Sequence, residues 1–348
     1  MVTQADKLYM RRAFELALAG RGRVSPNPLV GCVIVGADGQ VIGEGWHRKY
    51  GEAHAEVNAI NAVKDKERLK DATMYVTLEP CAHTGKTPSC ARLIRQYPFK
   101  KVYIANTDPN PLVDGQGIEL LKDAGVGVQT GVLEDLGYRV NARFFTYMKR
   151  RRPYIILKWA ETADGFIARE DFSSKWISGR LSRILVHKWR TEEDAVMVGG
   201  RTAHYDNPAL NARDWTGRNP VRIVIDRGLR LSPALALFDQ TQKTLCYNEI
   251  SSEEDGNIIF IKLDKSGGLE DLIEDLYRKN IQSVLVEGGA TLLNTFLNLG
   301  LWDEIRRFRS EEVYFGSGIA APRCSDAPDE SIQVRSDRLD IILNRRLL

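Results

Sequence analysis

The chain has 348 residues, a length that corresponds to about two ordinary domains. Hydrophobic residues make up 43% of it and charged residues 27%, which lies within the range of soluble globular proteins. The net charge of +3 is nearly neutral for this length, so the composition argues against a nucleic-acid-binding protein, whose surface normally has a strongly basic face.

The N-terminal stretch Met1 to Leu18 is amphipathic and charged, unlike the apolar core of an export signal. The sequence contains no apolar run long enough to span a bilayer. Its five cysteines are an odd number and widely scattered. In the reducing cytoplasm cysteines are more often metal ligands than disulfides. We therefore expect a cytoplasmic protein without a membrane partner.

The first half of the sequence alternates between helical and strand-like patterns. Apolar residues at helical spacing predict a helix over Gln4 to Ala19, and a loop rich in Gly, Pro and Asn follows. Asp38-Gly39 is a hairpin signal. The other predicted elements are strands at Leu29 to Val35, Val41 to Trp46, Met74 to Leu78 and Val102 to Ala105, and helices after His54, near Pro80, at Gly117 to Ala124 and at Leu133 to Met148.

A basic run, Lys149 to Arg152, precedes Pro153, and a helix should end before a proline. The four cations could contact nucleic acid, but a solvated linker is the preferred interpretation. After the run the α/β pattern restarts, with strands predicted near Tyr154 to Leu157, Ala195 to Val198, Val221 to Ile225, Ile258 to Lys262 and Val284 to Val286. The sequence thus predicts two α/β domains in series, residues 1–150 and 151–348.

The first half contains His54-Ala-Glu56, then Pro80-Cys81, then Cys90. Zinc prefers nitrogen and sulfur ligands, and a catalytic site needs three of them, with the fourth position left for water. A lone His or Cys is usually a core residue, and we interpret Cys32, Cys246 and Cys324 in that way. The group of four instead predicts a zinc ion held by His54, Cys81 and Cys90.

Glu56 is then free to move protons. Residues two apart on a helix point in different directions, so zinc must lie over the N-terminal end of the helix after His54. Cys81 is expected at a second helix start, where the partial positive charge favours a thiolate. This is the arrangement of zinc deaminases, in which a nearby Glu is the general acid and base. We expect Glu56 to take a proton from water, deliver it to a ring nitrogen, and help ammonia leave.

The interval between the two cysteines is longer than in the common deaminase pattern, and here the resemblance becomes specific. Pro80-Cys81-x-His83-x-Gly85-Lys86-Thr87-Pro88-x-Cys90 resembles the deaminase half of the bifunctional riboflavin-biosynthesis deaminase–reductases. Ser89 stands where that family usually has a second proline. The resemblance extends to Ser25 to Gly31, His47, Tyr50 to Glu56, and Asp108 to Pro111. It implies that Asn27, His47 and Lys86 contact the pyrimidine substrate or its phosphate, although His47 and His83 could instead be structural.

The second half lacks a G-x-G-x-x-G motif after a strand, so an ordinary dinucleotide-binding fold has no support. Two strands instead run into glycine pairs, Gly199-Gly200 and Gly288-Gly289. A strand that enters a Gly-Gly turn and then a helix exposes backbone N–H groups where an anion can bind. Each pair taken alone is equally compatible with a tight strand–helix connection.

The neighbouring motifs strengthen the binding interpretation. They are Lys158-x-Ala160-x-x-x-Asp164-Gly165, Ser174-x-Trp176-Ile177-Ser178, and Asp206-Asn207-Pro208-x-Leu210-x-x-Arg213. Their order resembles the reductase half of the same bifunctional family, which implies a dihydrofolate-reductase-like fold and NADPH as the cofactor. The cofactor contacts that it implies are Ala160, Trp176, Thr202, Asp206, Gly289, Ala290, Thr291, Leu292, Leu293, Asn294 and Thr295. The implied substrate contacts are Ser174, Arg190, Leu210, Arg213 and Glu287.

Arg190 and Arg213 suit a ribose phosphate because guanidinium pairs bidentately with phosphate. Trp176 could instead pack in the core. Arg227 stands where a small polar cofactor contact is expected, and we assign it no role. The residues alone do not separate NADPH from NADH.

The combined prediction is a cytidine-deaminase-like α/β/α domain followed by a dihydrofolate-reductase-like α/β domain. The resemblance implies zinc-dependent hydrolytic deamination of 2,5-diamino-6-ribosylamino-4(3H)-pyrimidinone 5′-phosphate. NADPH-dependent reduction of the ribosyl group to ribityl would follow. We expect a small phosphorylated pyrimidine as the partner, no nucleic acid, and a homo-oligomer.

Two alternatives belong to other classes. A nucleic-acid base deaminase with an accessory binding domain would need a strongly basic face, which the near-neutral charge does not favour. An inactive metal-binding regulatory module would not need Glu56, because the ligands alone suffice for structure.

Overall fold

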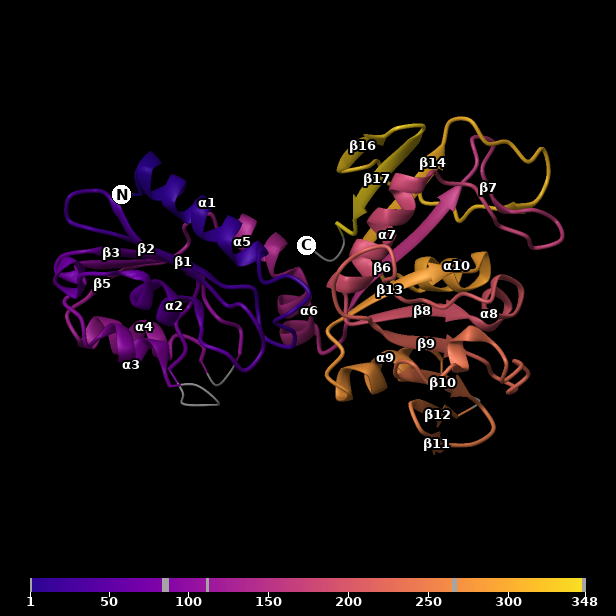
Figure 1. Cartoon of the computed structure of the whole chain (residues 1–348), viewed down its shortest axis with the longest axis horizontal. Coiled ribbons are helices and arrows are strands. Elements are labelled where there is room, and N and C mark those ends of the chain that lie inside the picture. The colour runs from indigo at the N-terminus through magenta and orange to yellow at the C-terminus, as the bar shows by residue number, and fades with distance from the viewer. Residues whose placement is uncertain (1, 83–87, 111–112, 265–267, 346–348) are drawn as a thin grey trace. The chain divides into compact units, whose positions relative to one another are not determined.

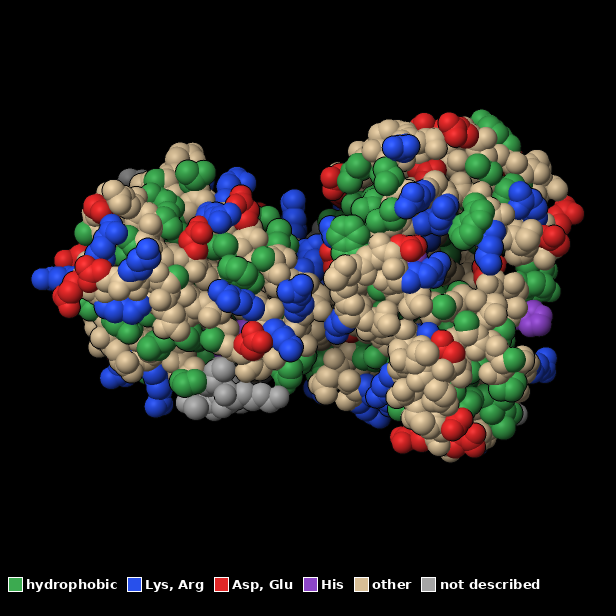
Figure 2. Space-filling view, viewed as in Figure 1, with side chains coloured by type: hydrophobic (Ala, Val, Ile, Leu, Met, Phe, Trp, Pro, Cys, Tyr) green, Lys and Arg blue, Asp and Glu red, His purple; other side chains and the backbone are tan. Residues whose placement is uncertain are grey.

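The computed structural model describes residues 2–82, 88–110, 113–264 and 268–345. The chain divides into two compact units, Met1–Arg151 and Arg152–Leu348 (Figure 1), and the division falls inside the basic run before Pro153. Among the helices of the described ranges, none combines the length and the apolar character needed to cross a bilayer. Lys and Arg side chains are interspersed with Asp and Glu on the face drawn in Figure 2, as expected from the balanced composition.

The first unit contains a five-stranded sheet with strand order β2-β1-β3-β4-β5. Its strands are β1 (Gly31–Val35), β2 (Val41–Trp46), β3 (Thr73–Leu78), β4 (Lys101–Asn106) and β5 (Gly127–Gln129). β1 runs antiparallel to β2 and β3, whereas β3, β4 and β5 are parallel. The carboxyl ends of the parallel strands therefore lie at one edge of the sheet.

Helices cover both faces of this sheet. The helices of the unit are α1 (Gln4–Leu18), α2 (Ala55–Ala62), the 3-10 helix η1 (Lys66–Leu69), α3 (Cys90–Ile94), α4 (Gln116–Asp123), α5 (Glu134–Val140) and α6 (Ala142–Arg150). Successive strand residues point to opposite faces. Val33 accordingly packs in the cluster that contains α1, whereas Cys32 and Ile34 pack in the cluster that contains α2, α3 and α4.

Helix α2 lies directly on β2 because two glycines leave that strand without side chains at the contact. A Cβ atom at Gly45 would lie 2.3 Å from Ala59 N, and one at Gly43 would lie 2.5 Å from Ala59 O. Any larger residue would push the helix away from the strand. This close packing fixes the N-terminal end of α2, where His54 is the N-cap and Glu56 lies in the first turn.

The prediction of a helix near Pro80 was wrong, because the helix begins at Cys90. Ser89 is its N-cap, and its side chain accepts a hydrogen bond from Arg92 N. Proline is favoured at a first helical position, but serine is a strongly preferred N-cap, and here the helix starts after Ser89 and not at Pro80. Cys81 lies beside this helix, and its carbonyl accepts a hydrogen bond from Ala91 N. Cys90, and not Cys81, is therefore the cysteine at a helix start.

The predicted helix from Leu133 to Met148 is divided at Asn141 into α5 and α6. The Asn141 amide accepts a hydrogen bond from Leu29 N at 2.8 Å and donates one to Leu29 O at 2.9 Å. Asparagine favours such bonds to the backbone over a position inside a helix. The break ties the two helices to the segment that leads into β1.

The second unit contains a ten-stranded sheet, in the order β11-β12-β10-β9-β8-β13-β6-β14-β17-β16, and a two-stranded sheet of β7 and β15. From β12 to β14 in this order the neighbouring strands are parallel, and antiparallel pairs lie at both ends. The strands are β6 (Tyr154–Glu161), β7 (Phe166–Ala168), β8 (Ala195–Gly199), β9 (Val221–Ile225), β10 (Thr244–Asn248), β11 (Glu253–Asp255), β12 (Ile258–Lys262), β13 (Ser283–Gly288), β14 (Glu304–Ser310), β15 (Ile319–Ala320), β16 (Glu330–Val334) and β17 (Asp337–Leu343).

The helices of this unit are α7 (Arg180–Glu192), α8 (Gly200–Asp206), the 3-10 helix η2 (Ala236–Phe238), α9 (Leu269–Arg278) and α10 (Ala290–Leu299). They cover both faces of the large sheet. Met197 of β8 packs in the cluster with α9 and α10, whereas its neighbours Val196 and Val198 pack with α8. In a largely parallel sheet covered in this way, ligands bind outside the carboxyl ends of the strands.

Candidate functional site

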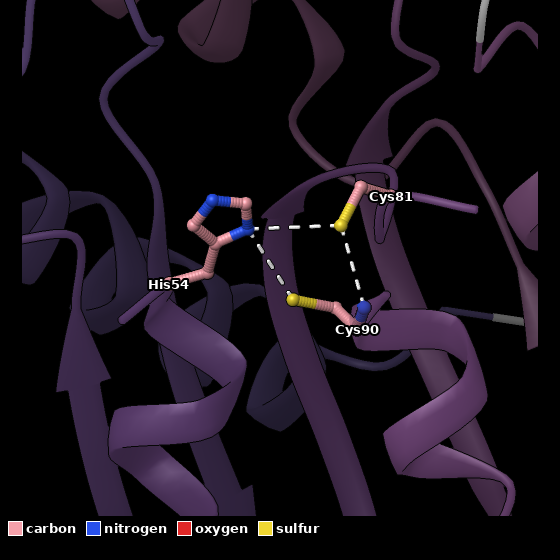
Figure 3. Close-up of side chains that lie close together, drawn as sticks. All are labelled: His54, Cys81 and Cys90. Atoms are coloured by element: carbon pink, nitrogen blue, oxygen red, sulfur yellow. Dashed lines mark hydrogen bonds between the residues drawn. The ribbon is translucent and has the colours of Figure 1, made fainter. Parts of the chain in front are cut away.

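Three side chains from separate segments of the first unit converge (Figure 3). His54 Nδ1 lies 3.7 Å from Cys81 Sγ and 3.4 Å from Cys90 Sγ. The ligand atoms of all three residues lie within 4.8 Å of one another. His54 caps α2, Cys90 begins α3, and Cys81 follows the end of β3. The edge of the sheet thus brings together the residues that the sequence predicts to hold a metal ion.

This donor set fits zinc. Tetrahedral zinc with ordinary bonds of about 2.0 Å to nitrogen and 2.3 Å to sulfur separates such a nitrogen from such a sulfur by about 3.5 Å. The observed separations of 3.7 Å and 3.4 Å lie on either side of that value. Hydrogen bonds from Cys90 and His54 lower the pKa of Cys81, which favours the thiolate that a metal ion needs.

Glu56 is buried in the first turn of α2, two residues after His54. Burial raises the pKa of its carboxyl to about 7, and the carboxyl also takes part in a hydrogen bond with Cys90. A carboxyl group with a pKa near the working pH can both accept and donate a proton. Glu56 therefore has the position and the pKa of a proton-transfer group.

Two predicted substrate contacts, Asn27 and His47, lie beside the metal cluster. Asn27 Nδ2 is 3.1 Å from His47 Nε2, and His47 Nδ1 is 3.2 Å from Ala53 O. The imidazole ring of His47 packs edge-on against that of His54, with 5.3 Å between centroids. The other predicted contact, Lys86, lies outside the described residues, as does His83.

Sequence reasoning missed Glu79, which directly precedes Pro80-Cys81. Its buried carboxylate accepts backbone hydrogen bonds of 3.0 to 3.3 Å, and the donors are Asp108 N, Gly115 N, Gly117 N and Ile118 N. Two of these N–H groups belong to the first turn of α4. The side chain therefore joins the end of β3 to the loop after β4 and holds the Cys81 segment in place. Its only sequence signal is its position before the Pro-Cys pair.

The second unit contains a cavity of about 850 Å³ at the carboxyl edge of its large sheet. Most of the contacts predicted for this half line it, namely Ala160, Ser174, Trp176, Arg190, Thr202, Asp206, Leu210, Arg213, Glu287, Gly289, Ala290, Thr291, Leu292, Leu293 and Thr295. Asn294 belongs to α10 but is not part of the cavity wall. The described wall thus gathers residues that are far apart in the sequence.

Both glycine pairs form strand-to-helix turns at this cavity. Gly199 precedes α8 and Gly289 precedes α10, and neither helix start has a side-chain cap among the described residues. Gly289 has a φ of +82°, which favours glycine, and a Cβ there would lie 2.9 Å from Thr202 Oγ1. Thr202 of α8 therefore packs against the turn at Gly289. The backbone N–H groups at the two helix starts could bind an anion such as a diphosphate.

Trp176 is 61% exposed, so the alternative of a core-packing role is wrong. The guanidinium of Arg183 lies 4.4 Å from the centroid of its ring. Nearby, Ser174 Oγ donates a hydrogen bond of 3.0 Å to Asp206 Oδ1. Ser174 was predicted to contact the substrate and Asp206 the cofactor, so the two groups of predicted contacts adjoin here.

A buried ion pair lies in the wall of the cavity. Arg190 Nε and Nη2 donate to the two carboxylate oxygens of Glu287 at 2.6 Å and 2.7 Å. Burial lowers the pKa of the neighbouring Lys158, and the negative charge of Glu287 opposes that shift. Lys158 opens one of the motifs singled out in the sequence, but the sequence assigned it no role; its position in the cavity wall makes it a candidate functional residue.

Family models match both halves of the chain. Residues 3–106 match the cytidine and deoxycytidylate deaminase zinc-binding region, and residues 153–317 match the RibD C-terminal domain. The riboflavin biosynthesis protein RibD of Aquifex aeolicus is 38% identical over 347 residues, which cover 98% of this chain and 96% of that protein. The chain belongs to the RibD family.

Solved structures of RibD proteins agree over nearly the whole chain. The diaminohydroxyphosphoribosylaminopyrimidine deaminase/5-amino-6-(5-phosphoribosylamino)uracil reductase of Thermotoga maritima is 38% identical, with a TM-score of 0.87, and the match covers 97% of this chain and 98% of that one. Acinetobacter baumannii RibD is 35% identical, with a TM-score of 0.89, and the match covers 98% and 99%. The predicted fold class, a deaminase-like α/β/α domain followed by a reductase-like α/β domain, is confirmed.

Each of the two sites falls within the residues matched by one family model. The deaminase zinc-binding region includes His54, Cys81 and Cys90, and the RibD C-terminal domain includes the Arg190–Glu287 pair. Membership of the family therefore agrees with the separation of the two sites into two units.

Proposed function

We propose that this RibD-family chain is a bifunctional enzyme of riboflavin biosynthesis. In this proposal residues 1–150 deaminate 2,5-diamino-6-ribosylamino-4(3H)-pyrimidinone 5′-phosphate by hydrolysis, and residues 151–348 reduce the ribosyl group of the product to ribityl with NADPH. The observation that carries the proposal is the His54–Cys81–Cys90 cluster beside a buried carboxyl group with a pKa near neutrality. The Thermotoga maritima protein, which bears both activities in its name, matches nearly the whole chain.

In the deaminase half, His54, Cys81 and Cys90 would hold zinc. A zinc ion bound there would lower the pKa of water to about 7 and so make hydroxide available at neutral pH. Glu56 accepts one proton from the attacking water and donates it to a ring nitrogen of the pyrimidine. It then transfers the proton of the added hydroxyl group to the amine, which leaves as ammonia. Asn27 and His47 bind the edge of the base, and Lys86 binds the phosphate as a point charge.

In the reductase half, a bound NADPH would supply the hydride for C1′ of the ribosyl group. The C1′–O4′ bond breaks as the sugar ring opens, and O4′ takes up a proton from solvent. The helix starts after Gly199 and Gly289, which have no side-chain cap among the described residues, would bind the diphosphate of the cofactor through their backbone N–H groups. Trp176, Thr202 and Asp206 line the cofactor side. Ser174, Leu210 and Arg213 line the substrate side, together with the Arg190–Glu287 pair. Because the carboxylate of Glu287 neutralises the positive charge of Arg190, Arg213 is the arginine best suited to bind the phosphate.

The proposed substrate is a small phosphorylated pyrimidine, and we propose that the chain acts as a homo-oligomer. The rival function, deamination of bases in nucleic acid, predicts a face rich in Lys and Arg. On the drawn face both charge signs are mixed among the described residues (Figure 2), which favours the small substrate.

The test is incubation of the full-length protein with the diamino substrate, with and without NADPH. We expect ammonia release in both mixtures and loss of nicotinamide absorbance only after deamination. Treatment with a zinc chelator should abolish ammonia release while NADPH oxidation on previously deaminated substrate continues. Ammonia release that survives complete metal removal would contradict the deaminase assignment, and absence of NADPH oxidation would contradict the reductase assignment.

A further inference from the structure

Helix α7 carries a histidine to which the proposed function assigns no role. His187 lies one helical turn before Arg190, is 4% exposed, and lines the cavity. Its Nδ1 lies 3.0 Å from Asn211 O, and its Nε2 lies 3.1 Å from Asp214 Oδ2. Both oxygens belong to residues 211–214, a short segment between α8 and β9 that also carries Arg213.

The two oxygens that His187 contacts are both hydrogen-bond acceptors. A neutral imidazole has one N–H group, whereas an imidazolium has two. The neutral ring can therefore donate to Asn211 O or to Asp214, but not to both. Protonation of His187 completes the second hydrogen bond, so the imidazolium holds residues 211–214 more firmly than the neutral ring does.

Charged groups from several elements surround this ring. On its own helix lie Arg190, which is paired with Glu287 and also donates to Asn211 O at 2.9 Å, and Arg183, which donates to Ser178 O. Arg213 and Asp214 face it from the 211–214 segment, and Glu287 of β13 and Lys158 of β6 complete the wall. Burial lowers the pKa of His187, Arg190 and Arg213 lower it further, and Asp214 opposes them. The protein without substrate therefore favours the neutral ring.

We propose that His187 is a proton-linked positioning residue of the reductase. It takes up one proton from solvent when the substrate's phosphate binds beside Arg213, and the imidazolium then fixes residues 211–214 around that phosphate. The inference rests on the proposed function, which assigns a phosphorylated substrate to this cavity. The phosphate offsets the positive charge of Arg213, and that charge is one of the groups that disfavour the imidazolium.

The sign of the pH dependence follows from this coupling. Substrate raises the pKa of His187, so the substrate binds more tightly at a pH below the pKa of the free protein. The advantage is lost as the pH rises through the pKa of the complex. An upward shift of about one unit corresponds to about a tenfold change in affinity. Because the role proposed for His187 is to hold residues 211–214 and not to act on the reacting atoms, we expect the change in KM and not in kcat.

The experiment compares the full-length protein with His187→Asn, in which the amide keeps a donor for Asn211 O but does not titrate. The reductase kcat and KM for the deaminated substrate are measured from about pH 5.5 to about pH 8.5. We expect the KM of the variant to exceed that of the parent about tenfold at the acid end and to approach it at the alkaline end, with a constant ratio of kcat values. The substrate phosphate itself titrates near pH 6, but this affects both proteins and cancels in the ratio. A KM ratio independent of pH would overturn the inference.

A second measurement covers the case in which His187→Asn does not fold. Calorimetry of ribose 5-phosphate binding at about pH 7, in two buffers that differ in ionisation enthalpy, reports the protons taken up by the full-length protein. We expect net uptake, and less uptake in Asp214→Asn, whose side chain is 51% exposed in the parent and so tolerates replacement. Equal uptake in parent and variant, or none in the parent, would contradict the proposal. A parent protein that does not oxidise NADPH would remove the proposed function as well, whereas an active parent without proton linkage would remove only this inference.

Discussion

The two sites of this chain are built in different ways. The metal cluster of the first unit depends on three ligand atoms that lie within 4.8 Å of one another, next to one buried carboxyl group. The cavity of the second unit has a volume of about 850 Å³ and a wall drawn from β6, α7, α8, β13 and α10. The function of the first site depends on a few atoms that bind the metal ion or move a proton. In the second site, binding depends on many weaker contacts along the cavity wall. Single substitutions should therefore abolish the first activity more completely than the second.

The largest expected effect is that of Glu56→Gln, which keeps the shape of the side chain but cannot accept a proton. Deamination should fall by about 10²- to 10⁴-fold, the usual contribution of a general acid–base group. Zinc content and NADPH oxidation on previously deaminated substrate should not change. The measurement is ammonia release and NADPH oxidation by one preparation. Undiminished deamination would remove Glu56 from the mechanism, and loss of both activities would show that the variant is misfolded.

The next effect concerns the ion pair in the reductase cavity. Glu287→Gln should leave the buried guanidinium of Arg190 without its charge partner, at a cost of about 3 kcal/mol. A loss of this size in the binding free energy of the substrate lowers the reductase kcat/KM by about 100-fold, which is the expected result. Deamination by the same preparation is the internal control. A reductase that keeps its full kcat/KM would show that the pair only packs the wall.

A smaller effect is expected from the packing of α2. In Gly45→Ala the added Cβ would lie 2.3 Å from Ala59 N, which must displace the helix that carries His54 and Glu56. Overpacking of this kind costs about 1–3 kcal/mol. Gly127→Ala is the matched control in the same sheet, because its nearest atom, Lys100 O, would be 3.2 Å away. Denaturant unfolding and zinc retention should be affected more in the first variant, and equal effects would mean that α2 adjusts freely.

The smallest effect should come from a surface ion pair. Arg12 donates to Glu44 at 2.7 Å, and the two side chains are 46% and 34% exposed. Pairs exposed to this degree contribute about 1 kcal/mol or less. Arg12→Ala should leave both activities unchanged and lower the midpoint of denaturant unfolding only slightly. A large loss of deamination would contradict the view that deaminase activity depends mainly on the metal cluster and Glu56.

The sequence could predict the metal cluster because its chemistry lies in the residue types themselves. An imidazole, a carboxylate and two thiols in that order indicate a zinc site before any fold is known. The sequence also predicted the α/β class of both halves, since strand and helix patterns alternate along the chain. The position of Cys81 was harder to predict, because the helix that it was expected to begin starts at Cys90.

Contacts between distant segments that belong to no recognisable motif could not be predicted. Glu79 accepts hydrogen bonds from residues near 108 and 115–118, and Asn141 holds Leu29, because the fold brings these segments together. The contact of His187 with Asp214 is of the same kind. Nothing in a local pattern distinguishes such side chains from solvent-exposed ones. Burial and hydrogen-bond geometry in the folded protein supply that information.

The most direct test of the account is the zinc content of the full-length protein, purified under reducing conditions, beside that of Cys90→Ser. The account predicts about one zinc ion per parent chain and little or none in the variant, because only His54 and Cys81 remain as strong ligands. A folded parent protein that takes up no zinc, or a variant that binds it equally well, would contradict the assignment of this cluster as the metal site.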